Sequence, residues 1–285
     1  MSDKALTPKS QKAGFDAKLE KLVQDNFLRS KGINPTEPRQ LTIWGEDFRE
    51  LPNDFARSSI WSVRNKGEER QVLEGAVLVH LDQKIKITYT GIELRADDDK
   101  LLYLQLVHYA RNASLGSLVE FNLNQLCTDL GWTVNGRNYD RCRLCISRLK
   151  ATEIRVTHEE MGRGVAMSFI ASYSFNDDNG KEKGSKYTVS IPEELILLVA
   201  GGRSTRLLWE PYRGLKPIAG RLYDYVASHK QPFPLTLAKF KAVCGSTTAD
   251  ARKWRQMVRA ACNELIAVGL VQKAWVADEK IYFVR

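Results

Sequence analysis

Apolar residues recur every three or four positions between Ser246 and Gly269. At about 100° per residue, this spacing predicts an amphipathic helix with one apolar stripe. The stripe carries Trp254, Val258, Ala261, Leu265 and Val268. Upstream, a shorter amphipathic run over 237–243 ends at Gly245, a residue type that commonly closes a helix. The two runs therefore predict a helix, a tight turn and a second helix.

The chain alternates or runs apolar again after Gly269. Residues 270–276 and 280–284 predict two strands around a polar tip at 277–279, which is the pattern of a β-hairpin. A helix-turn-helix followed by a hairpin predicts a winged helix, whose second helix enters the DNA major groove. Opposite the apolar stripe of that helix lie Arg252, Arg255, Gln256 and Arg259. The alternative for this basic face is a solvated surface without a DNA partner.

A similar order of elements is predicted earlier in the chain. Residues 97–99 are three aspartates, which favour the first turn of a helix that continues to about residue 112. Further helices are predicted over 121–130, closed by Gly131, and over 137–150, with Cys142, Cys145, Ile146 and Leu149 on the apolar stripe. Strands over 154–158 and 165–175 flank residues 161–164, so we expect a wing there with Arg163 at its tip.

The two series of elements correspond at low sequence identity. The pairs that match at one constant offset are Leu126 with Phe240, Gly131 with Gly245, Arg141 with Arg255, and Leu144 with Val258. After a two-residue slip, Leu149 and Ile154 match Leu265 and Leu270. A repeat of this kind predicts two structural units of the same type in tandem.

We therefore predict an α+β protein with two tandem winged-helix domains and a flexible N-terminal arm. The arm spans residues 1–46, with a short helix over 15–28 and a linker with two prolines over 31–39. The first domain spans 47–191 and includes a hairpin of residues 75–81 and 84–91 and a strand over 186–191. The second spans 192–285 and begins with a helix over 192–200 and a connector over 201–216.

A five-residue island follows the linker, formed by Gln40, Leu41, Thr42, Ile43 and Trp44. Its glutamine can hydrogen-bond while Leu41, Ile43 and Trp44 enter an apolar pocket. The pattern resembles the pentapeptide Gln-Leu-small/polar-Leu-Phe by which bacterial replication proteins bind the sliding clamp, with Ile43 and Trp44 replacing its last two residues. The alternative is a strand or loop that packs Trp44 into the neighbouring domain.

Composition favours a folded protein with a polyanionic partner. The 285 residues suffice for two domains, and the formal net charge is +9 with a pI near 9.3. A basic surface binds nucleic acid because neutralised phosphates release their counterions. Five cysteines without a recognisable secretory signal predict reduced thiols in the bacterial cytoplasm. No apolar run approaches the ~18 residues that span a bilayer.

No motif for catalysis, a cofactor or a metal is recognisable. Cys142-x-x-Cys145 is half of a zinc motif without a second half, and core positions are the alternative for both thiols. His158-Glu159-Glu160 lacks the second histidine of a zinc protease, and no phosphate-loop or nucleophile-elbow motif matches. We therefore expect a protein that is not an enzyme, with no catalytic residues, no cofactor and no metal.

Tandem winged helices, a basic chain and the pentapeptide together resemble the initiators of iteron-containing, theta-replicating plasmids. The stretches 40–44 and 249–275 resemble in particular the TrfA family of IncP plasmids. The resemblance implies a major-groove DNA contact in each domain. The implied DNA-binding residues are Arg137, Asn138, Arg141, Arg148 and Arg163 in the first domain and Arg252, Lys253, Arg255, Gln256 and Arg259 in the second.

The resemblance also implies partners. These are double-stranded DNA with direct repeats at a plasmid origin, the host initiator DnaA, the replicative helicase and the sliding clamp. Single-stranded DNA of an opened A+T-rich segment is a further candidate. Monomers of this family act at the origin, whereas dimers are inactive and limit plasmid copy number. One alternative is a dimeric winged-helix transcriptional repressor, which prefers an inverted repeat. A more distant alternative is a scaffold whose winged helices bind protein.

Overall fold

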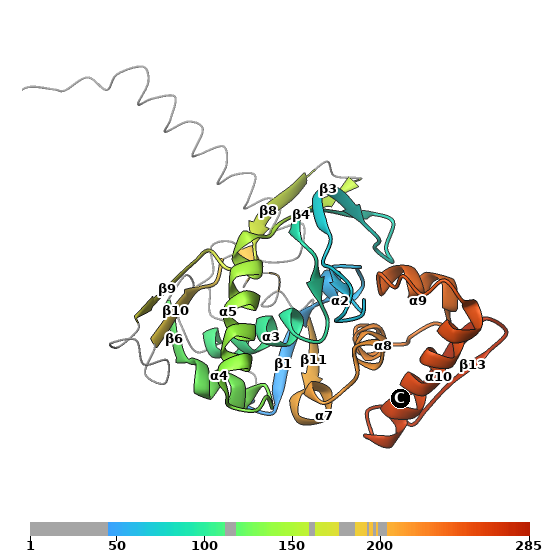
Figure 1. Ribbon diagram of the computed structural model, residues 1–285. Helices are drawn as coiled ribbons and strands as arrows, with labels where there is room; N and C mark the ends of the chain where they lie inside the picture. The colour runs from blue at the N-terminus through green and yellow to red at the C-terminus, as the bar shows by residue number, and fades with distance from the viewer. Residues whose placement is uncertain are drawn as a thin grey trace, which may run out of the picture.

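The structure is a computed structural model that describes residues 45–111, 118–159, 163–176, 186–192, 194, 195, 198 and 204–285. The predicted arm helix, the linker and the pentapeptide over 40–44 lie outside the described residues. Helices and mostly antiparallel strands form an α+β fold of two tandem winged-helix units. Each unit has its own hydrophobic core, and Figure 1 shows the second, orange to red, beside the first.

Helix α3 (Asp99–Ala110) lies at the centre of the first core. Every residue from Asp99 to His108 is buried, so the helix is enclosed on all sides and not only along one apolar face. The acidic start predicted for it is confirmed, because the Asp98 side chain caps the helix by accepting a hydrogen bond from the Asp99 amide. Helix α5 (Gly136–Ala151) and strand β1 (Phe48–Pro52) pack against it (Figure 1).

Four aromatic side chains connect separate parts of this core. The ring of Phe169 lies 5.2–5.6 Å, centroid to centroid, from those of Phe55, Trp61 and Tyr103. All four side chains are buried. Phe55 comes from α2 (Asn53–Ala56), and Trp61 comes from β2 (Trp61–Ser62), which pairs with β5 (Leu94–Arg95). The cluster ties the start of the first unit to α3.

A four-stranded antiparallel sheet covers one end of the first unit. Its strands, in spatial order, are β3 (Val72–Leu78), β4 (Ile85–Ile92), β7 (Glu153–His158) and β8 (Arg163–Ser168). The β3–β4 pair confirms the hairpin predicted around residues 82 and 83. At Gly91, with φ 147°, a Cβ would lie 2.9 Å from Thr152 Oγ1, so the close approach of the two chains requires glycine.

A second sheet in this unit has three strands, in the order β6 (Leu118–Asn122), β10 (Lys186–Ser190) and β9 (Ser172–Asn176). The single strand predicted over 165–175 is wrong, since the chain leaves β8 at Ser168 and enters β9 in another sheet. The helix predicted from residue 121 begins at Leu123 as α4 (Leu123–Asp129), because Phe121 and Asn122 belong to β6. The strand predicted over 186–191 is confirmed by β10.

The second unit contains the predicted helix-turn-helix and hairpin. Its helices are α8 (Pro217–Ala227), α9 (Leu237–Val243) and α10 (Ala251–Ala267). Strand β12 (Leu235–Thr236) precedes α9, and the hairpin is β13 (Lys273–Ala277) with β14 (Lys280–Val284). Gly245, with φ 59°, follows α9 and confirms the predicted closure of that helix. Figure 1 shows α8 between the first unit and α10.

Residues 204–213 are structured, so the connector predicted over 201–216 is wrong for that part. Strand β11 (Ser204–Leu208) pairs antiparallel with β1. Helix α7 (Trp209–Arg213) then places Trp209 and Tyr212 in the first core. The domain boundary predicted between residues 191 and 192 stays a prediction. Trp209 and Tyr212, which follow that boundary, pack in the first core.

The two units share one sheet topology. In each, the strand before the second helix pairs with the last strand of a hairpin, as β6–β10–β9 in the first unit and β12–β14–β13 in the second. The hairpin β9–β10 therefore has the topological place of the wing in the first unit. The hairpin predicted as that wing, β7–β8, pairs instead with β4 and belongs to the four-stranded sheet.

Candidate nucleic-acid interface

Helix α10 presents its predicted basic face to solvent. The carboxylate of Asp250 caps the helix by accepting hydrogen bonds from the amides of Arg252, at 2.7 Å, and Lys253, at 3.3 Å. On the apolar side, the Trp254 indole is buried and donates to the Leu237 carbonyl at 3.1 Å, which fixes α10 against α9. The exposed polar residues of the first three turns are Arg252, Lys253, Gln256 and Arg259.

Arg255 on the same face differs from its neighbours because it has an acidic partner. Its guanidinium forms an ion pair with Glu279 in the turn between β13 and β14. Asp278 and Glu279 have φ values of 47° and 57°, the left-handed conformation of a two-residue hairpin turn. Within the part of the chain that the structure describes, Arg252, Lys253 and Arg259 form no ion pair. Among these four side chains, a wing carboxylate would therefore compete with an anionic ligand for Arg255 only.

The start of α5 offers a smaller basic surface. Asn135 caps the helix by accepting a hydrogen bond from the Asn138 amide. The Asn138 side chain donates to the Thr133 carbonyl at 2.7 Å, so it holds the turn before the helix. Arg137 is exposed beside it. Of Arg137 and Asn138, Arg137 is therefore the better candidate for a DNA contact, because its side chain is exposed whereas that of Asn138 is hydrogen-bonded to the backbone.

Arg141 lies farther along the same helix and is held by two residues, Trp132 and Asp97, and the carboxylate of Asp97 lies 3.8 Å from its guanidinium. Its guanidinium carbon lies 3.8 Å from the centroid of the Trp132 ring, a cation–π contact. It also donates to the Asp97 carbonyl at 2.9 Å. The side chain is 25% exposed, which leaves part of the guanidinium available to a phosphate. The geometry thus supports a restrained, preoriented cation.

Arg148 binds the acidic start of α3. Its guanidinium lies 2.7 Å from Asp99 Oδ1 and 3.5 Å from Asp98 Oδ2. Arg70 binds the same two carboxylates at 2.6 and 2.7 Å. With a side chain that is only 12% exposed, Arg148 is placed to hold α5 against α3. This placement favours a structural role over the predicted DNA contact.

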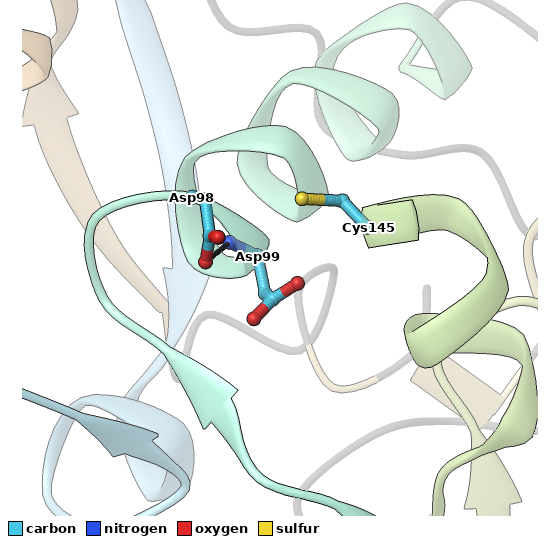
Figure 2. A group of neighbouring side chains, drawn as sticks. All are labelled: Asp98, Asp99 and Cys145. Atoms are coloured by element: carbon cyan, nitrogen blue, oxygen red, sulfur yellow. Dashed lines mark hydrogen bonds between the residues drawn. The ribbon is translucent and has the colours of Figure 1, made fainter. Parts of the chain in front are cut away.

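Asp98, Asp99 and Cys145 form a group with the ligand types for a metal ion, shown in Figure 2. Two guanidinium groups already supply the positive charge that a cation would bring. Burial, with the charge of Asp98, raises the pKa of Asp99 to about 6. Burial also raises the pKa of the Cys145 thiol, which disfavours the thiolate that binds metals. The arrangement favours an ion-pair cluster over a metal site.

The half zinc motif noted in the sequence, Cys142-x-x-Cys145, lies in the core. Cys142 and Cys145 are fully buried, and the sulfur of Cys142 lies 3.7 Å from that of Cys127. All five cysteines are free thiols and buried. The packing of Cys142 and Cys145 matches the alternative interpretation, in which they are small core residues on the apolar stripe of α5.

The predicted register between α5 and α10 is wrong by two residues at Arg141 and Leu144, whereas the predicted match of Leu149 with Leu265 is confirmed. Leu144 was matched with Val258, yet Leu144 is 58% exposed while Val258 is fully buried. The buried residues of the two helices match as Cys142 with Val258, Cys145 with Ala261, Ile146 with Cys262, and Leu149 with Leu265. The two-residue slip therefore lies in the turn before the helix, and not within the helix between Leu144 and Leu149 as predicted. In this register Arg137 matches Lys253, and Arg143 matches Arg259.

Arg143 is the candidate that the predicted set omits. It is partly exposed, with an ion pair to Asp140 at 2.8 Å and a hydrogen bond to the Tyr187 hydroxyl at 3.1 Å. Tyr187 lies on β10, so Arg143 connects α5 to the hairpin β9–β10. The burial register with α10 is the signal that identifies it. Of the remaining predicted residues, Arg163 begins β8 without a described side chain, and residues 40–44 lie outside the described part.

The chain resembles known proteins in sequence and in fold. The sequence model of the family described as TrfA protein matches residues 35–285. The plasmid replication initiator protein TrfA of Escherichia coli is 42% identical over 242 residues, which cover 85% of this chain and 63% of that protein. The crystal structure of a selenomethionine derivative of domains 2 and 3 of RctB aligns with a TM-score of 0.53 at 13% identity. It covers 81% of this chain and 95% of that one, and it supports the fold alone.

None of the helices in the described ranges combines the length and the apolar character needed to cross a bilayer.

Proposed function

The chain belongs to the TrfA family, and from this premise we propose that it initiates the replication of plasmid DNA. It spans less than two thirds of the length of its named relative, so the function is inferred from the part that the two share. In this proposal the chain acts by binding and assembling partners, without catalysis of its own.

One observation carries the proposal: two winged-helix units in one chain, with a solvent-facing basic helix in the second. On α10, Arg252, Gln256 and Arg259 lie opposite the residues that pack in the core. Arginine and glutamine contact base edges in the major groove, and arginine also contacts phosphate. Two units of the same topology in one chain suit two major-groove contacts on successive parts of one DNA segment.

The finer steps of the proposal follow from the family. The chain binds direct repeats at a plasmid origin and promotes opening of an adjacent A+T-rich segment. It helps to load the host helicase together with DnaA, and residues 40–44 recruit the sliding clamp. Dimers are the inactive form and limit copy number. Its net charge of +9 supports binding to DNA. In this proposal the chain acts in the bacterial cytoplasm.

The arrangement of repeats in the DNA that the chain prefers tests this function. The purified chain is titrated with direct-repeat and inverted-repeat duplexes of equal length across a salt series, with stoichiometry read from the same samples. We expect one monomer per direct repeat and a steep salt slope, because several phosphates are neutralised. A dimer on the inverted repeat would support the transcriptional repressor instead. No specific binding to either duplex would leave the basic face as a solvated surface.

A further inference from the structure

A cluster of buried polar side chains joins the two units. Lys100 on α3 of the first unit lies 2.8 Å from Asp224 on α8 of the second. Arg221, also on α8, lies 2.7 Å from the same carboxylate and donates to the Ser58 carbonyl at 2.5 Å. The Tyr212 hydroxyl donates to the other Asp224 oxygen at 2.6 Å. The three charged side chains are at most 1% exposed.

Further hydrogen bonds and apolar contacts connect the two units around this cluster. The Val63 amide donates to the Cys244 carbonyl at 2.9 Å, and Thr247 donates to Glu68 at 3.1 Å. Arg57 donates through Nε to the Ser228 hydroxyl at 3.2 Å. Apolar side chains cross the junction as well, since Val63 packs against the second core and Tyr223 against both cores. The units therefore share a continuous interface and not only a covalent link.

Buried charges make such an interface selective for one arrangement. A buried ion pair is tolerated only with good geometry, because each ion has given up its hydration. Burial lowers the pKa of Lys100 to about 8 even though Asp224 acts against this change. If one unit slid on the other by a few ångström, the 2.8 Å contact between Lys100 and Asp224 would be lost. Rotation of the units is therefore much more costly here than at an apolar interface.

The two helices that carry the pair are also the ones that support the candidate DNA helices. Helix α3 packs against α5, and α8 packs against α10. The Lys100–Asp224 pair thus connects the two helices, α3 and α8, against which α5 and α10 pack. A change in the relative position of α3 and α8 moves α5 relative to α10.

We propose that this buried joint of Lys100, Asp224, Arg221 and Tyr212 determines the spacing between the two DNA half-sites that the chain accepts. The joint's members are positioning residues that act through α5 and α10 and do not touch DNA. The inference rests on the proposed function, because it needs both units to bind one DNA segment. Moving one half-site by one base pair displaces it by about 3.4 Å and rotates it by about 35°. With a rigid joint, α5 and α10 cannot both move to match the displaced half-site, so affinity falls.

The test compares spacing profiles of the full chain. Duplexes that the wild-type chain selects from a random library supply the probe, and insertions or deletions of one and two base pairs between the half-sites supply the series. For the wild type we expect at least a tenfold loss of affinity for a one-base-pair change. Lys100→Met keeps the side-chain length and leaves Asp224 paired with Arg221 and Tyr212. We expect it to reduce that loss to less than about threefold.

A control variant and a second, milder variant of the joint separate its effect from general damage to the fold. Lys216→Met removes one exposed lysine near α8 and should keep the wild-type profile. Tyr212→Phe removes only a hydroxyl and should flatten the profile in part, so it serves if Lys100→Met does not fold. A profile for the folded joint variants identical to that of the wild type would overturn the inference while leaving the proposed function intact. Failure of the wild type to select any DNA site would overturn both.

Discussion

Single arginines on the two candidate DNA helices differ in their surroundings. Arg252 and Arg259 on α10 point to solvent, whereas Arg255 binds Glu279 and Arg148 binds Asp98 and Asp99. An arginine with a buried carboxylate partner gains little by leaving it for a phosphate. An arginine paired at the surface exchanges partners more easily, because a surface ion pair contributes at most about 1 kcal/mol.

Glu279 should therefore restrain DNA binding through Arg255. We expect Glu279→Gln to raise affinity for the selected duplex about three- to tenfold, because it frees Arg255 and removes a negative charge beside the phosphates. We expect Arg255→Ala to cost about 1–3 kcal/mol if Arg255 reads a base. Fluorescence anisotropy titrations over a salt series measure both effects.

The matched control for this pair is Glu153→Gln, which removes an exposed carboxylate on β7, in the four-stranded sheet of the other unit. It should change affinity less than Glu279→Gln does. Unchanged affinity and salt slope for Arg255→Ala would exclude Arg255 from the DNA contact.

Among elements, those defined by a local pattern could be predicted from sequence. Helices α5 and α10 and the hairpin β13–β14 follow from periodicity, a cap and a turn within one short stretch. Strands β6 and β11 could not be predicted in this way, because they are stabilised by partners far along the chain, β10 and β1. Helix α3 has apolar residues on all sides, and only its neighbours show that each side is covered.

The same distinction separates the two halves of the candidate interface. On α10, exposure follows the helical period, so the predicted basic face is also the exposed one. On α5, Arg141 and Arg148 share a predicted face, but α3 and the turn before it bring Asp97, Asp98 and Asp99 against that face. Periodicity does not show which neighbouring element supplies such partners.

Phe169 lies between β8 and β9, which the sequence pattern predicts as a single strand over 165–175. It follows β8, precedes β9 and contacts three other aromatic rings. We expect Phe169→Ala to lower the free energy of unfolding by about 3–5 kcal/mol, because it leaves a cavity among them. Denaturant titration measures this loss. Phe233→Ala, at a side chain that is 75% exposed, should cost less than about 1 kcal/mol. Equal costs for the two variants would contradict the packing.

At the scale of the whole molecule, the proposed function combines the two candidate DNA-binding units with the N-terminal segment. We expect Leu41→Ala together with Trp44→Ala to abolish binding to purified sliding clamp and to leave binding to the selected duplex intact. Surface plasmon resonance on immobilised clamp measures the first, and the anisotropy titration measures the second. Thr42→Ala should keep both activities. Loss of the thermal unfolding transition in the double variant would instead indicate that Trp44 packs into the folded domain.

The pairing of β1 with β11 has a consequence for synthesis on the ribosome. Strand β1 begins at Phe48, and its partner ends at Leu208, so the first unit cannot complete its fold before the chain has been translated beyond residue 208. At ~5–20 residues per second, β1 waits on the order of ten seconds or more for its partner. During that time its backbone donors and acceptors are exposed to other nascent chains. Production of the folded protein should therefore depend on chaperones that bind extended segments early in translation.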